Sequence, residues 1–163
     1  MKANSQILLF LVCICVITSC SFSKGSKTLP LLGLSYSYNG LSVDDIKLYD
    51  TNENSPLKNK KIKIGRTLLI YIEDLTGFVV EDDKIFPACE ITVTDSDGNI
   101  MLHSDDLYTD QSGYDANMNN FSLTVGMGSP IVGGKDYKTV AHFYDKKNPK
   151  NKLDITVKSE VIE

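Results

Sequence analysis

The chain is poor in several residues on which catalytic sites depend. It contains no tryptophan and only two histidines, His103 and His142. Glycosidases that use paired carboxylates hold their sugars largely by aromatic stacking, so the lack of tryptophan argues against that class of enzyme. Neither histidine lies near a G-x-S-x-G sequence or another nucleophile motif, and their spacing is not that of a zinc site. We therefore expect a protein that is not an enzyme.

Two further absences narrow the class of protein. No apolar run approaches the roughly 20 residues that a membrane-spanning helix needs, which excludes a polytopic membrane protein. Basic residues are not in excess, since 17 Lys and Arg stand against 21 Asp and Glu, and this argues against nucleic acid as a partner. The apolar fraction of 42% and the charged fraction of 23% in 163 residues are typical of one globular domain.

The first nineteen residues have the features of a secretory signal. Lys2 provides a positive charge, residues 7–17 carry no polar side chain, and Thr18, Ser19 and Cys20 follow directly. A charged start, a short apolar stretch and a small-residue end are typical of a signal peptide that is removed, and the stretch is too short for a permanent anchor. We expect residues 1–19 to be absent from the mature protein.

The end of this segment resembles the lipobox of bacterial lipoproteins. Ile17, Thr18, Ser19 and Cys20 provide an aliphatic residue, two small residues and the obligatory cysteine. The resemblance implies that the Cys20 thiol receives a diacylglyceryl group, that lipoprotein signal peptidase cuts before Cys20, and that the new amino group is then acylated, commonly with palmitate. Two or three acyl chains hold a soluble domain stably on a bilayer, whereas one holds it marginally.

The residues after Cys20 indicate where such a lipoprotein would reside. Ser21 replaces the aspartate that retains many enterobacterial lipoproteins at the inner membrane, so the resemblance implies the outer membrane. No acidic cluster follows Cys20, which favours the periplasmic face over the cell surface. The stretch that follows is polar and without periodicity, and we expect residues 20–32 to form a lipidated flexible tether.

Cys89 is the one cysteine left after signal removal and lipidation. Cys13 and Cys15 lie in the signal, and Cys20 is modified, so the mature chain cannot form an internal disulfide. Cys89 follows Pro87 and Ala88, where a strand is expected to begin, and a free cysteine there behaves as a small buried apolar residue. We expect a structural role for Cys89.

The remainder of the chain, residues 33–163, shows the alternation of β-strands. Short runs with an apolar residue at every second position are separated by Gly, Pro, Asn and Asp clusters, and no window has a sustained helical period. The pattern predicts an all-β domain, an immunoglobulin-like or C2-like antiparallel β-sandwich. The residues expected to face inward include Ile70, Ile91, Val93, Phe121, Leu123 and Phe143.

Acidic residues in one part of the chain raise the question of a calcium site. An EF-hand loop is excluded, because its first and twelfth positions fall on Val93 and Ser104. The candidate oxygen ligands from loops at one end of a sandwich are Asp95, Asp97, Asp105, Asp106 and Asp110. Asp97 and Gly98 also form a strong hairpin-turn sequence. We expect these carboxylates to serve separate turns and assign no metal or other cofactor.

The functional expectation is a lipid-anchored cell-envelope protein whose β-sandwich binds another envelope component without catalysis. Two alternatives remain open, a secretion-system or assembly lipoprotein and a calcium-dependent ligand-binding sandwich. The basic stretch with Lys146, Lys147, Lys150 and Lys152 fits either contact with anionic head groups or a hairpin loop kept soluble by its lysines. The second interpretation is preferred.

Overall fold

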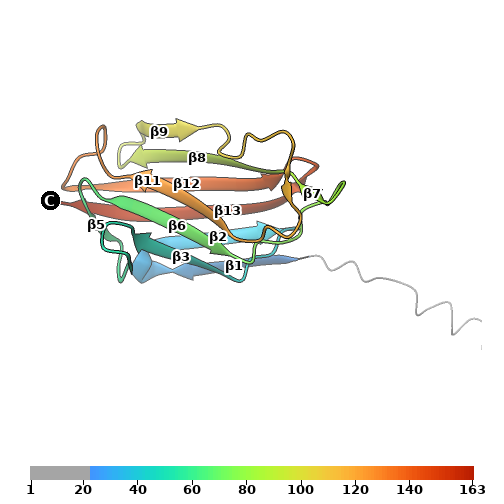
Figure 1. Cartoon of the computed structure of the whole chain (residues 1–163). Coiled ribbons are helices and arrows are strands. Elements are labelled where there is room, and N and C mark those ends of the chain that lie inside the picture. Colours follow the sequence, from blue (N-terminus) through green and yellow to red (C-terminus); the bar gives the residue numbers. More distant parts are fainter. Residues whose placement is uncertain (1–22) are drawn as a thin grey trace, which may run out of the picture.

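The computed structural model describes residues 23–163, which form two β-sheets packed face to face (Figure 1). The predicted signal peptide and Cys20 lie outside the described residues. Within the described part there is no α-helix, and one 3-10 turn, η2, spans Pro30–Leu32. No helix in residues 23–163 is long and apolar enough to cross a membrane. The predicted all-β sandwich is confirmed.

The larger sheet contains the long C-terminal strands at its centre. Its order is β1-β2-β13-β12-β8-β9, with antiparallel pairing throughout, and β5 runs parallel to the last residues of β13. The bounds are β1 Lys24–Leu29, β2 Leu34–Asn39, β5 Lys61–Lys63, β8 Pro87–Asp95, β9 Ile100–Ser104, β12 Lys135–Asp145 and β13 Asn148–Ile162.

The smaller sheet has the order β11-β6-β3-β4, and it covers part of the larger sheet (Figure 1). Its strands are β3 Asp45–Asp50, β4 Ser55–Pro56, β6 Thr67–Glu73 and β11 Phe121–Gly126. A two-residue ladder joins β7 Lys84–Ile85 to β10 Tyr114–Asp115 beside the sandwich. The strand-rich sequence therefore forms two unequal layers.

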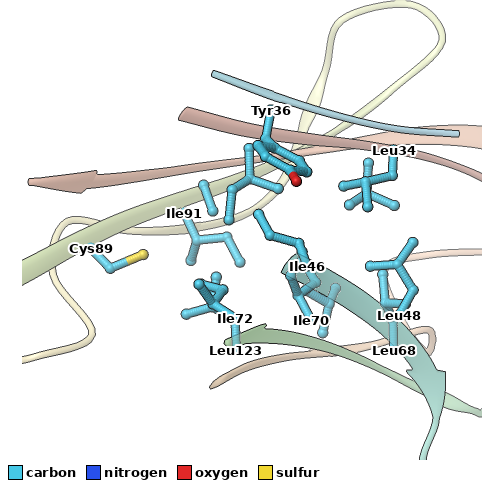
Figure 2. Close-up of a cluster of buried hydrophobic side chains, with 14 of the residues drawn as sticks. Leu34, Tyr36, Ile46, Leu48, Leu68, Ile70, Ile72, Cys89, Ile91 and Leu123 are labelled. Carbon is cyan, nitrogen blue, oxygen red and sulfur yellow. The ribbon is translucent and has the colours of Figure 1, made fainter. Parts of the chain in front are cut away.

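Side chains from the two inner faces fill the space between the sheets (Figure 2). Each strand buries alternate residues, because successive side chains of a strand point to opposite faces. In β6, for example, Leu68, Ile70 and Ile72 are fully buried while Leu69 and Tyr71 are partly exposed. The six residues predicted to face inward are all buried: Ile70, Ile91, Val93, Phe121, Leu123 and Phe143.

The prediction of a flexible tether over residues 20–32 is wrong for residues 24–29. These residues form β1, which pairs with β2 from Lys24 opposite Asn39 to Leu29 opposite Leu34. The turn that joins the two strands is completed by Gly33, whose φ of 67° is accessible to glycine at little cost. As an edge strand with mostly exposed side chains, β1 needs little apolar periodicity, and so the sequence pattern missed it. The sandwich begins at Lys24 and not at residue 33.

Candidate functional site

The strands give the sandwich two ends, and β1 begins at one of them. Lys24, Asn39, Lys152 and Tyr144 are successive partners across β1, β2, β13 and β12. The backbone of Ser23 is held there, since its carbonyl accepts a hydrogen bond of 2.8 Å from the N–H of Gly40. We call this the proximal end. The C-terminus and the β8–β9 turn lie at the opposite, distal end (Figure 1).

The five candidate calcium ligands do not converge. Asp95 and Asp97 lie in the β8–β9 turn at the distal end, and Asp105, Asp106 and Asp110 follow β9 toward the proximal end. Asp95 accepts hydrogen bonds from the backbone N–H groups of Asp97 and Asn99, at 3.0 and 2.8 Å. In residues 23–163 no three His, Cys, Asp or Glu side chains gather as a metal site would require. The predicted turn is confirmed, with a φ of 86° at Gly98.

Asp106 has a structural role of its own. Its carboxylate accepts hydrogen bonds from the backbone N–H of Cys89 at 3.0 Å and of Tyr108 at 2.8 Å, and Lys146 lies 2.7 Å away. Burial by itself would raise the pKa of Asp106, but these hydrogen bonds together hold the pKa below its ordinary value. Through these contacts, the Asp106 side chain holds the loop after β9 against β8 and against the β12–β13 hairpin.

Cys89 is fully buried in the core, as predicted (Figure 2). Burial raises the pKa of its thiol far above the usual range, and the nearby carboxylates of Asp106 and Glu90 add to that effect. Nucleophilic cysteines need the opposite environment, exposed and electropositive. The Cys89 thiol stays protonated and is not suited to thiolate chemistry.

Each histidine pairs with a carboxylate on the outer side of the larger sheet. His103 Nε2 lies 2.9 Å from Asp105, and His142 Nδ1 lies 2.5 Å from Asp154. Ser37 is the strand partner of Asp154 on the side away from His142. A Ser-His-Asp triad needs the imidazole between the hydroxyl and the carboxylate, and here the carboxylate is in the middle. This arrangement does not activate the serine.

A hollow lined by aromatic side chains on the outer face of the smaller sheet is a candidate binding surface. Its volume is about 300 Å³, and its lining consists of Tyr49, Thr51, Asn54, Leu69 and Tyr71. Tyr49 lies directly opposite Leu69 across β3 and β6, so two phenol rings and an isobutyl group share this face. We call these five residues the tyrosine hollow. The unbroken apolar run through β6 is the sequence signal for the tyrosine hollow, because the outward positions of a strand whose outer face meets water are normally polar.

Strand β9 forms a second exposed feature at the free edge of the larger sheet. Ile100 and Leu102 are 64% and 37% exposed, and β9 contains no charged residue and no proline. The edge strands β1 and β5 carry lysines, and β4 contains a proline, which are features that discourage strand addition. In β5, the exposed Lys61 and Lys63 stand on either side of the buried Ile62. Strand β9 has neither a lysine nor a proline, and a shift of register between Val93 and Thr94 interrupts its pairing with β8.

Comparison with known proteins supports the architecture. No family model matches the chain, and no curated protein matches it. Among solved structures, the C-terminal domain of wzt is similar with a TM-score of 0.52 and 10% identity, over 86% of this chain and 79% of that one. The soluble domain of PmoD from Methylocystis sp. ATCC 49242 (Rockwell) covers 71% of this chain and 88% of its own, at 9% identity and a TM-score of 0.39. The first similarity concerns the β-sandwich fold alone.

Proposed function

We propose that this protein is a lipid-anchored component of the bacterial cell envelope, held at the periplasmic face of the outer membrane, whose sandwich binds another envelope protein without catalysis. The lipid is attached to Cys20, and the partner binds at the tyrosine hollow. The observation that carries the proposal is this hollow, an aromatic and apolar concavity on a sheet face that is otherwise exposed to water.

The position of β1 supports the anchoring. Three residues separate Cys20 from Lys24, and at the reach of an extended chain they span at most about 14 Å. A lipid on Cys20 thus keeps the proximal end of the sandwich next to the bilayer. Diffusion in two dimensions at a fixed height favours encounters with other envelope proteins over soluble ligands.

The chemistry of the hollow supports a protein partner. Tyrosine is enriched at protein interfaces, because it provides a large apolar contact area and a hydroxyl group for hydrogen bonding. The hollow is much smaller than a complete interface, which covers about 800 Å² on each partner. It accommodates one apolar or aromatic anchor side chain, with the surrounding outer face of β3 and β6 completing the contact. Next to it, Lys47 and Glu73 form a 2.7 Å ion pair that provides a polar rim.

The absence of catalysis is supported by the state of the reactive groups. The Cys89 thiol is buried with a raised pKa, and each histidine lies against a carboxylate, His103 against Asp105 and His142 against Asp154. His103 also lies 2.9 Å from the hydroxyl of Thr92, in an exposed position on β8 and β9. Of the candidate carboxylates, those of Asp95 and Asp110 cap turns, and those of Asp105 and Asp106 form ion pairs.

Photocrosslinking in intact cells tests the partner surface. We expect a benzophenone amino acid at Tyr71 to form a specific adduct with one envelope protein, and Tyr49→Ala in the same chain to reduce its yield. Thr156, partly exposed on the outer face of the larger sheet, is the matched control position and should give no adduct. The same adduct from both positions, or none from Tyr71, would contradict the proposal.

Lipidation is tested separately. We expect Cys20→Ala to leave the precursor uncleaved and without lipid, as read by intact mass and by metabolic labelling with an alkyne fatty acid. Cys89→Ala is the control and should be processed normally. A Cys20→Ala chain that is still cleaved before residue 20 and stays with membranes after an alkaline wash would refute the anchor.

A second candidate function, an assembly lipoprotein, is favoured by β9. An extended segment of a partner could add to this free edge, with apolar contacts to Ile100 and Leu102 and hydrogen bonds from the backbone. Exposed Asp97 and Asp105 flank the strand, so the segment would carry basic residues at its ends. Leu102→Lys should then abolish assembly, whereas Leu31→Lys, at another exposed leucine, should not. Equal behaviour of the two variants would exclude β9.

A further inference from the structure

A polar groove crosses the outer face of the larger sheet at the proximal end. Its volume is about 700 Å³, and it runs over β1, β2 and the first part of β13. The groove exists because the outer face carries short side chains there, since Ser26 and Ser37, which are strand partners, have only a hydroxymethyl group. The polar residues that line it are Lys24, Ser26, Ser37, Asn39, Lys152 and Asp154.

The groove is arranged to favour an anion. Lys24 and Lys152 are the strand partners of Asn39 on its two sides, so the two lysines stand about 10 Å apart across the groove. The carboxylate in the groove, Asp154, is already engaged by His142 at 2.5 Å and by Lys152 at 3.3 Å. Lys24 forms no ion pair with any described residue. The result is an unneutralised positive charge beside serine hydroxyl groups that can donate hydrogen bonds.

The neighbouring lysines differ from Lys24. Lys146 is bound to Asp106 at 2.7 Å, and Lys147 is bound to Glu81 at 2.5 Å. Their charges are compensated within the protein. In the basic stretch of the sequence, Lys146 and Lys147 thus stabilise loops. Lys152 differs from them because it lines the groove, together with Lys24.

The groove also lies where the chain leaves the sandwich. Lys24 lines the groove and is the first residue of β1. It lies four positions after Cys20 in the sequence. We propose that this groove binds the phosphate of an anionic phospholipid head group in the same leaflet that holds the acyl chains on Cys20. The inference rests on the proposed anchoring, because the span of at most about 14 Å brings the groove to the head groups. Binding there turns the outer face of the larger sheet toward the bilayer and leaves the tyrosine hollow, on the opposite outer face, open to a partner.

The experiment measures how fast each lysine of the mature protein, purified from membranes, reacts with a water-soluble amine-acylating reagent. The probes are dihexanoyl phosphatidylglycerol, dihexanoyl phosphatidylcholine and inorganic phosphate, all below micelle-forming concentration. We expect phosphatidylglycerol to slow the acylation of Lys24 and Lys152 severalfold and to leave Lys138, on the same face but outside the groove, unchanged. Phosphatidylcholine should protect none of the three.

Variants define the site. Lys24→Gln and Lys152→Gln should each raise the half-saturating phosphatidylglycerol concentration about fivefold, which corresponds to about 1 kcal/mol per charge. Lys138→Gln, the matched control, should not change it. Equal protection by both lipids, or no protection, would overturn the inference. Protection by inorganic phosphate as strong as that by phosphatidylglycerol would also overturn it, because the site would then recognise a free anion.

The outcome separates this inference from the anchor. Intact mass of the same preparation shows whether Cys20 carries lipid, and the soluble short-chain lipids reach the groove whether or not it does. A lipidated chain without protection refutes the groove and leaves the anchor standing. An unlipidated chain with protection refutes the anchor and retains the groove.

Discussion

Phe121 offers the sharpest test of how the two sheets are held together. It is 1% exposed and belongs to β11, at the edge of the smaller sheet. Its ring lies 5.5 to 5.9 Å from those of Phe78, Tyr108 and Phe143, so one side chain contacts a strand of the opposite sheet and two loops. Replacement by alanine removes a contact that joins four segments of the chain.

The expected cost follows from the area and the pairing. Truncation removes about 150 Å² of buried apolar ring surface. At about 25 cal/mol per Å², the lost burial amounts to about 4 kcal/mol. Loss of aromatic pairing and incomplete collapse of the cavity keep the total within the range of about 3–5 kcal/mol for such truncations. For a domain of this size the midpoint of thermal unfolding should fall by about 12–16 °C.

Urea unfolding followed by far-ultraviolet circular dichroism measures this cost. The midpoint should fall while the denaturant slope stays constant, because the same surface is exposed on unfolding. Phe121→Leu keeps most of the apolar volume and should cost under about 1.5 kcal/mol. Ser122→Ala, at an exposed neighbour, should stay within about 0.5 kcal/mol of the parent. A cost below about 1 kcal/mol for Phe121→Ala at constant slope would refute this account of the core.

Three further predictions concern the acidic loops and Cys89. Millimolar calcium should leave the thermal midpoint within about a degree, because Asp95 and Asp105 lie at opposite ends of β9; a rise that Asp95→Asn abolishes would contradict this. Asp106→Asn should cost about 1–2 kcal/mol at pH 7. The folded state lowers the pKa of Asp106. The stabilisation by its carboxylate is therefore complete above the unfolded pKa near 3.9 and is lost as the pH falls through the folded pKa. In acid-unfolding curves, the free energies of unfolding of the variant and the parent should converge below about pH 4. Native Cys89 should not react with an aromatic disulfide reagent at pH 8 and should react fully in denaturant; rapid native reaction would show an accessible thiolate.

Local patterns were sufficient for the strand-rich fold and its core. The inward set, such as Ile70, Val93 and Phe143, was predictable because a strand places every second side chain on one face, and burial of one face selects apolar residues at that period. The Asp97-Gly98 turn was predictable for a similar reason, since its geometry depends on the residues that form it. The buried, structural role of Cys89 followed from its place at the start of a strand.

Features that depend on which strands become neighbours were not predictable. Strand β1 has no apolar period of its own, and its pairing with β2 decides that Lys24 belongs to the sandwich. The tyrosine hollow needs β3 beside β6, and the groove needs β1, β2 and β13 side by side, although Lys24 and Lys152 are far apart in the chain. Alternation of side chains is a property of one strand and can be read from its sequence. Adjacency of strands results from packing of the whole chain, so the tertiary structure alone brought the two lysines to one groove.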